Sequence, residues 1–175
     1  MTSMVEILHC TIEDIDTIFR LYRLATEYMR SKSPVYWPEF ERSMVETEIA
    51  QARQWKLLID GQIACVWATT FSDPQIWEEK NSDPSVYIHR IATDNVFRGH
   101  RLVQQIVEWA KEYARKNGKA FIRLDTVGNN QGLISHYCQC GFTFLGLVTL
   151  KDTSGLPSHY QLGPACLFEI ALRPQ

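Results

Sequence analysis

The residues best suited to chemistry lie together in the segment 87–101. An apolar strand, Tyr87-Ile88-His89-Arg90-Ile91-Ala92-Thr93, runs into a polar loop, and Arg98-Gly99-His100-Arg101 opens an amphipathic helix. The first turn of a helix presents backbone N–H groups that have no helical acceptor, together with the positive end of the helix dipole. These groups bind phosphate, and the basic side chains of the same turn add positive charge. The segment therefore predicts a site for a phosphate-bearing cofactor.

Composition limits the class of protein. The chain has 175 residues, 45% apolar and 22% charged, which is ordinary for one globular domain, here expected to span residues 1–175. With 18 Lys and Arg against 20 Asp and Glu, the net charge is −2, so we expect no nucleic-acid partner. The start of the sequence lacks the pattern of a signal peptide, and no apolar run approaches the ~20 residues that span a bilayer, so no membrane partner is expected. The five cysteines are an odd number in apolar or helical segments, which favours reduced thiols and a cytoplasmic location.

The first part of the chain is expected to form a strand, two helices and a hairpin. Residues 5–10 have a strand pattern, and Thr11 with Asp14 resembles a capping box for a helix that should run to about Ser31. The proline-containing segment 31–38 breaks this helix, and residues 39–53 fit a second one. Asp60-Gly61, between the apolar runs 55–59 and 62–68, is the strongest hairpin signal and favours a type I′ turn.

The rest of the chain alternates strands with helices. The helix after Gly99 has a continuous apolar face and should end at Asn117-Gly118. The other expected elements are a helical turn at 76–79, a helix at 130–140 with Leu133, Ile134, Tyr137 and Cys138 inward, and strands at 86–93, 120–127, 142–150 and 165–172. The order β-α-α-β-β-β-α-β-α-β-β predicts an α/β (α+β) fold.

This order, together with two motifs, resembles the GCN5-related N-acetyltransferases, the GNAT superfamily, over nearly the whole chain. The family's cofactor motif, Arg/Gln-Gly-x-Gly-x-Gly/Ala, reads Arg98-Gly99-His100-Arg101-Leu102-Val103 here, with Arg101 and Val103 in place of small residues. A later block reads Asn130, Tyr137 and Gly141-Phe142 with the family's spacing, and Arg123-Leu124-Asp125-Thr126 resembles one branch of the family. The resemblance implies a twisted mixed sheet of about seven strands flanked by about four helices, whose fourth and fifth strands separate at one end.

The resemblance also implies a cofactor, acetyl-CoA, and the residues that hold it. The backbone of Ile91, Ala92 and Thr93 would pair with the pantetheine arm, and Asn130 would hydrogen-bond this arm, cap a helix, or do both. The backbone N–H groups from residue 98 to 103 would bind the diphosphate, which main-chain groups of Arg and Val can do as well as those of Gly, and the Arg101 guanidinium could bond a phosphate. These phosphate-binding residues are Arg98, Gly99, His100, Arg101, Leu102 and Val103.

The implied activity is acetyl-CoA-dependent N-acetyl transfer to a primary amine of a small molecule or protein, by direct attack in a ternary complex. The alternative is a non-catalytic CoA-binding regulatory or sensor module, which the altered glycines favour. Tyr137 matches the family's tyrosine and is the candidate acid, unless it is only a core aromatic. His89 is the candidate base, although a structural histidine fits the same position, and Asp125 at a strand end is another candidate.

The acceptor side is less defined. Trp37 lies in the proline-flanked linker and Trp77 lies beside Glu78 and Glu79; both could face an amine cation, or they could anchor loops on the core. The late segment Ser158-His159-Tyr160 could also approach the acceptor. Cys138 and Cys140 do not share a helix face, and no His/Cys set has zinc-site spacing, so no metal is expected. An exposed last strand could pair across a homodimer.

Overall fold

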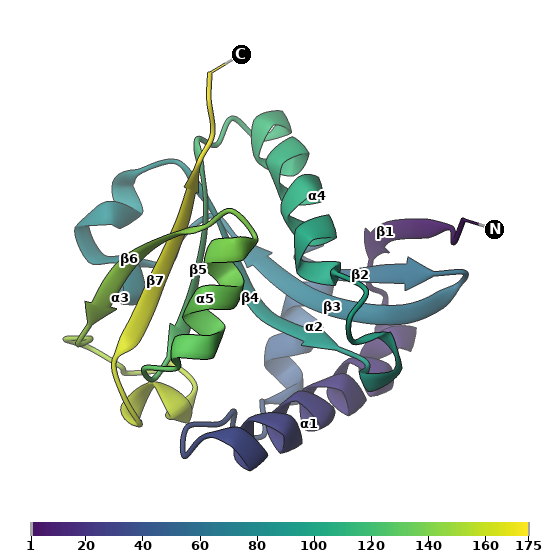
Figure 1. Ribbon diagram of the computed structural model, residues 1–175, viewed down its shortest axis with the longest axis horizontal. Coiled ribbons are helices and arrows are strands. Elements are labelled where there is room, and N and C mark those ends of the chain that lie inside the picture. Colours follow the sequence, from purple (N-terminus) through teal and green to yellow (C-terminus); the bar gives the residue numbers. More distant parts are fainter. Residues whose placement is uncertain (1, 175) are drawn as a thin grey trace. The chain divides into compact units, whose positions relative to one another are not determined.

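The computed structural model describes residues 2–174 and contains a seven-stranded mixed sheet in the order β1-β2-β3-β4-β5-β7-β6 (Figure 1). The strands are β1 (Val5–His9), β2 (Gln54–Ile59), β3 (Gln62–Thr70), β4 (Ser85–Thr93), β5 (Phe121–Val127), β6 (Thr143–Val148) and β7 (Ala165–Ala171). The helices are α1 (Ile15–Lys32), α2 (Arg42–Ala50), α3 (Pro74–Trp77), α4 (Leu102–Lys116) and α5 (Gln131–Gln139). Short 3-10 turns, η1 (Ile12–Asp14), η2 (Glu78–Ser82), η3 (Asn95–Phe97) and η4 (Ser158–Gln161), complete the chain.

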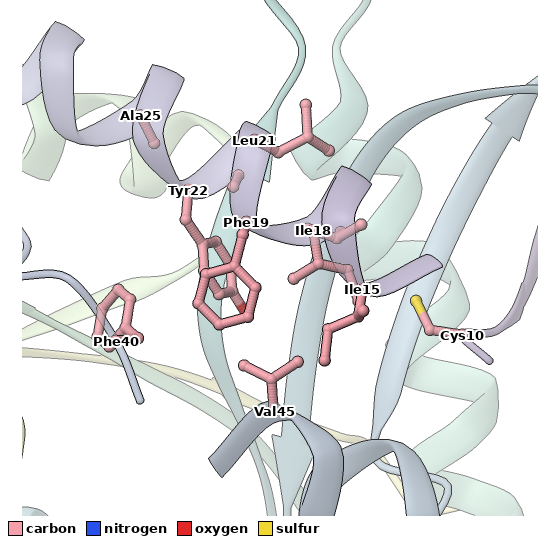
Figure 2. Close-up of a cluster of buried hydrophobic side chains, with 11 residues drawn as sticks. Cys10, Ile15, Ile18, Phe19, Leu21, Tyr22, Ala25, Phe40 and Val45 are labelled. Atoms are coloured by element: carbon pink, nitrogen blue, oxygen red, sulfur yellow. The ribbon is translucent and has the colours of Figure 1, made fainter. Parts of the chain in front are cut away.

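The chain divides into two compact units, and β4 contributes to both. The first unit, residues 1–69 and 89–102, holds β1, β2 and most of β3, with β2 antiparallel to both neighbours. Its core is built from the apolar face of α1, Val45 of α2, Val66 of β3 and Ala92 of β4. Figure 2 shows how Ile15, Ile18, Phe19 and Tyr22 project from α1 toward Val45 and Phe40. These α1 residues recur every three or four positions, and this spacing produces one apolar stripe.

The second unit, residues 70–88 and 103–175, holds the remaining strands. Residues 85–88 of β4 run parallel to 121–124 of β5, whereas β5–β7 and β7–β6 are antiparallel. A cluster of Ile76, Trp77, Tyr87, Tyr160, Ala165 and Leu167 packs loops and strands together. The mixed sheet confirms the predicted fold class, and the single domain expected over residues 1–175 stays a prediction.

Local signals placed most of the elements correctly. Asp60 and Gly61 have φ of 49° and 82°, the left-handed pair that a type I′ hairpin needs. The Thr11 N–H donates to Oδ2 of Asp14 at 2.8 Å, so the capping box exists, although it caps the turn η1 just before α1. Helix α2 is shorter than the predicted 39–53, since residues 33–41 have no regular secondary structure and a turn follows at 51–52.

Two expectations are wrong. Cys138 is exposed, because the short helix α5 buries only Ile134 fully and turns residue 138 to solvent. The last strand, β7, is not a free edge: β6 folds back on its outer side, so β7 lies between β5 and β6. Among residues 2–174, no helix combines the length and the apolar character needed to cross a membrane.

Candidate cofactor and catalytic site

Strand β4 changes its surroundings halfway along. Its pairing with β5 runs through Ser85–Ile88, and β5 continues beyond Leu124 with residues that pair with β7. The second half of β4 belongs to the first unit, where Ala92 is buried and Ile91 and Thr93 are half-buried. Because these residues lie past the last β5 pair, their main-chain groups are where an extended ligand could add to the strand.

The loop from Asp94 to Arg101 is held by its own side chains and by α1. The Asp94 carboxylate accepts the Val96 N–H at 3.2 Å and the Arg20 guanidinium at 3.1 Å. Arg98 donates to the side chain of Asn95 at 2.9 Å, and its guanidinium lies 4.1 Å from the centre of the Tyr28 ring. The loop that was predicted to bind phosphate is therefore ordered by contacts with α1 that the sequence did not reveal.

The basic side chains of this loop differ in whether they contact the rest of the protein. The Nδ1 atom of His100 lies 3.0 Å from the Phe97 carbonyl, so this nitrogen carries the proton and donates. Arg98 and His100 are thus engaged with the protein, whereas Arg101 is exposed and makes no hydrogen bond or ion pair within residues 2–174. Arg101 is the cation of this turn that stays available to a bound anion.

Arg101 also has an unusual backbone. Its φ of 56° is in the left-handed region, directly before α4 begins at Leu102. An L-residue there costs about 1–2 kcal/mol relative to the right-handed form, a penalty that glycine escapes. The family motif has glycine at this position. Here arginine stands in place of the glycine, but the left-handed backbone conformation is retained.

The turn has two features that suit an anion and one that limits it. Gly99, with φ of 88°, and Arg101 are both left-handed, a conformation common in anion-binding turns. The N–H groups of Arg98 and His100, however, donate to the carbonyls of Asn95 and Phe97, each at 3.3 Å. A Cβ placed on Gly99 would meet no atom within 4 Å, so the space around this residue is open. The 15-residue helix α4 follows with the N–H groups of its first turn, beginning at Leu102 and Val103 (Figure 1).

The second motif lies on α5, in the second unit. The Asn130 side chain accepts the Leu133 N–H at 3.1 Å, so Asn130 is a helix N-cap. The half-buried Tyr137 ring packs against Phe142 and Phe168, with centroids 5.9 and 5.3 Å away. Its ring is therefore part of the core packing, which leaves a role for the hydroxyl open. His89 is half-buried and belongs to the other unit.

A second set of polar residues gathers at the end of β5. The Tyr160 hydroxyl donates to Oδ2 of Asp125 at 2.7 Å, which brings two candidates far apart in the sequence into contact. A carboxylate oxygen of the buried Asp73 lies within 4.8 Å of one of Asp125. Two acidic groups beside a phenol form a site that suits a cation.

The two tryptophans both pack against other aromatic rings. Trp77 is 2% exposed and its ring lies 5.6 Å from that of Tyr87, while Trp37 packs edge-on against Tyr22 and Phe40. Burial fits the loop-anchoring interpretation for Trp77, whereas Trp37 is only half-buried and both interpretations remain for it.

Comparisons with known proteins agree with this geometry. The model of the acetyltransferase (GNAT) family matches residues 18–142. The uncharacterized N-acetyltransferase YesJ of Bacillus subtilis is 26% identical over 151 residues, which cover 82% of each chain. A GNAT-family acetyltransferase structure from Listeria monocytogenes superposes with a TM-score of 0.75 at 21% identity, covering 98% of this chain and 99% of that one. YncA of Salmonella typhimurium, a putative acetyltransferase solved with its cofactor acetyl-CoA, has a TM-score of 0.65 at 12% identity, and the match covers 98% of this chain and 95% of that one.

Proposed function

Because the chain belongs to the GNAT family, and is thus an acetyltransferase that uses acetyl-CoA, we propose that it acetylates a primary amine of a small molecule or a protein. The observation that carries this proposal is the left-handed turn at Gly99 and Arg101, which leads from the second half of β4 into α4. The amine attacks directly, with both substrates bound at once. A homodimer stays a prediction.

In this proposal the cofactor supplies an activated acetyl thioester, and the chain positions it. The backbone N–H groups of Gly99 and of residues 101–103 and the Arg101 guanidinium hold the diphosphate, whereas the N–H groups of Arg98 and His100 donate within the loop. The backbone of Ile91, Ala92 and Thr93 pairs with the pantetheine arm, and Asn130 contacts this arm while it caps α5. An N–H near Ile91 or Ala92 stabilises the negative charge that develops on the acetyl oxygen.

The reaction also needs proton transfer. An alkylamine with a pKa of ~10.4 must lose a proton, which at pH 7 costs roughly 4–5 kcal/mol. His89 is the proposed base, and Asp125, already bonded to Tyr160, is the alternative. Tyr137 is proposed to donate a hydrogen bond to the departing sulfur. Asp73 and Asp125 give the acceptor side a negative charge that attracts the protonated amine before it is deprotonated.

The proposal is tested first by ligand binding and then by turnover. At 100 times its Kd, acetyl-CoA should stabilise the protein by about 2.7 kcal/mol, measured as a rise in melting temperature. A panel of amines with acetyl-CoA should then give an acetylated product, detected by mass. Absence of a thermal shift contradicts the cofactor site. A thermal shift with no product from any amine supports the non-catalytic module instead.

Substitution of Arg101 separates the guanidinium from the backbone. Arg101→Gly and Arg101→Asn both tolerate a left-handed φ, so neither strains the turn. Each is expected to weaken CoA binding about tenfold or more, since one charge-assisted hydrogen bond contributes roughly 1.5–3 kcal/mol. Arg101→Lys keeps the positive charge, so its CoA affinity should fall less than that of the Gly and Asn variants. Titration calorimetry with CoA measures the effect, and wild-type affinity in the Gly and Asn variants would remove Arg101 from this role.

A further inference from the structure

Arg90 has a backbone conformation that a strand does not normally contain. Its φ is 52°, in the left-handed region, inside β4. A left-handed residue inside a strand breaks the regular extended backbone and redirects the strand after it, and glycine is the usual residue at such a position. Arg90 lies between Ile88, the last residue that pairs with β5, and Ile91–Thr93, the proposed cofactor-binding edge. The Arg90 backbone therefore influences the direction in which that edge presents its N–H groups.

The Arg90 side chain is anchored on two helices. Its guanidinium donates to both carboxylate oxygens of Glu48 on α2, at 2.5 Å to Oε2, and to the Tyr22 hydroxyl on α1 at 3.3 Å. The side chains of Arg90 and Glu48 are only 11% and 8% exposed. The guanidinium also lies over the rings of Tyr22 and Phe40, at 5.8 and 5.4 Å from their centroids, in the cluster that Figure 2 displays.

Gln54 of β2 completes this network. Its Nε2 donates to the Tyr22 hydroxyl at 3.0 Å and to Glu48 at 3.4 Å, and the residue is fully buried. Burial alone lowers the pKa of the Arg90 guanidinium, but the charges and hydrogen bonds of Tyr22 and Glu48 outweigh it, so the pKa is raised. Arg90 therefore stays charged.

We propose that Glu48 is a positioning residue: through Arg90 it holds the left-handed backbone of β4 at that residue and so aligns the 91–93 backbone with the acetyl carbonyl of the cofactor. This inference rests on the proposed function. Neither side chain needs to touch the cofactor. The ion pair offsets the cost of the left-handed backbone at Arg90. Backbone strain is often retained at functional sites, where it helps to hold groups in a reactive alignment. Loss of the pair should leave cofactor affinity, which depends mainly on the 98–103 turn, almost intact.

The test replaces both charges by apolar side chains. Glu48→Met combined with Arg90→Met removes both charges of the buried pair, and such replacements are often neutral or stabilising. Arg53, which pairs with Glu48 at 3.9 Å, is 31% exposed, so water can replace this contact. The readout is the 13C chemical shift of the carbonyl in [1-13C]acetyl-CoA, which reports its hydrogen bond from the strand. We expect the shift induced by wild-type protein to fall by at least about half in the double variant, because the N–H donor moves away. The Kd for acetyl-CoA from calorimetry should change less than about threefold, since the diphosphate turn is untouched.

A control variant and a second Glu48 variant separate loss of stability from loss of alignment. Lys56 and Asp14 form an ion pair of similar burial in the same unit, with side chains 15% and 14% exposed and a distance of 2.8 Å. Lys56→Met should lower the melting temperature but leave the carbonyl shift unchanged. If the double Met variant does not fold, Glu48→Gln, which keeps the volume, is measured in the same way. A folded variant with the wild-type carbonyl shift overturns the positioning role, whereas wild-type protein that does not bind acetyl-CoA refutes the proposed function itself.

Discussion

Replacing Arg123 by methionine is expected to lower the free energy of unfolding by about 3 kcal/mol, the lower end of the range for breaking a buried ion pair. The Arg123 side chain is 1% exposed, and it pairs with Asp83 and Glu169, each at 2.8 Å. It also donates to the Lys80 carbonyl at 2.7 Å and to the Tyr87 hydroxyl at 3.3 Å. The Asp83 side chain is 46% exposed, so water can solvate its carboxylate once Arg123 is gone. The loss of stability therefore comes mainly from the Glu169 carboxylate, whose side chain is only 18% exposed, and from the Lys80 carbonyl, because both lose a hydrogen-bond donor.

Urea or guanidinium unfolding measures this loss. Lys111→Met is the matched control, because it removes a cation paired with an exposed carboxylate, Glu108, on the surface of α4 in the same unit. Its loss should be only about 0.3–0.5 kcal/mol. The loss of stability for Arg123→Lys should lie between these two values, since lysine keeps the positive charge but lacks the planar set of donors of the guanidinium. A loss below about 1 kcal/mol for Arg123→Met would show that water replaces the buried contacts.

Replacing Tyr137 by phenylalanine is expected to lower kcat about 100-fold, equivalent to about 2.7 kcal/mol, the scale of a lost catalytic donor. A tyrosine phenol is ordinarily a weaker acid than a thiol, so full proton transfer to the departing thiolate would be uphill by about 2 kcal/mol, and the proposed role of Tyr137 is mainly that of a hydrogen-bond donor. The ring contacts with Phe142 and Phe168 survive in the variant, so the melting temperature should hardly change. The Kd for acetyl-CoA should stay within about threefold, because the diphosphate contacts remain.

Steady-state kinetics with an amine identified by the panel measure this effect. Tyr113→Phe is the control: its ring stacks on Trp109 and Phe71, at 4.9 and 5.9 Å, in the second unit, and it has no proposed part in the reaction. Unchanged kcat in Tyr137→Phe would return Tyr137 to the status of a core aromatic. An equal fall in both variants would point to loss of packing rather than loss of a donor.

Local chemistry in the sequence determined the elements and their order. The Asp60-Gly61 turn, the apolar faces of α1 and α4, and the Asn130 cap each depend on neighbours a few residues away, so their patterns could be read directly. The same local patterns, in the right order, predicted a cofactor turn at 98–103, and the structure has a left-handed turn there that leads into α4. The spacing of Asn130 and Tyr137 pointed to the second motif.

Only the tertiary structure decided which charged groups meet. Arg90 and Glu48 are 42 residues apart, Arg123 and Glu169 are 46 apart, and Asp125 and Tyr160 are 35 apart. No periodicity connects such pairs, because they are created when separate strands and helices pack. The left-handed backbones of Arg90 and Arg101 were hidden for a related reason: these conformations disfavour arginine locally, and only surrounding packing and chain connection can impose them.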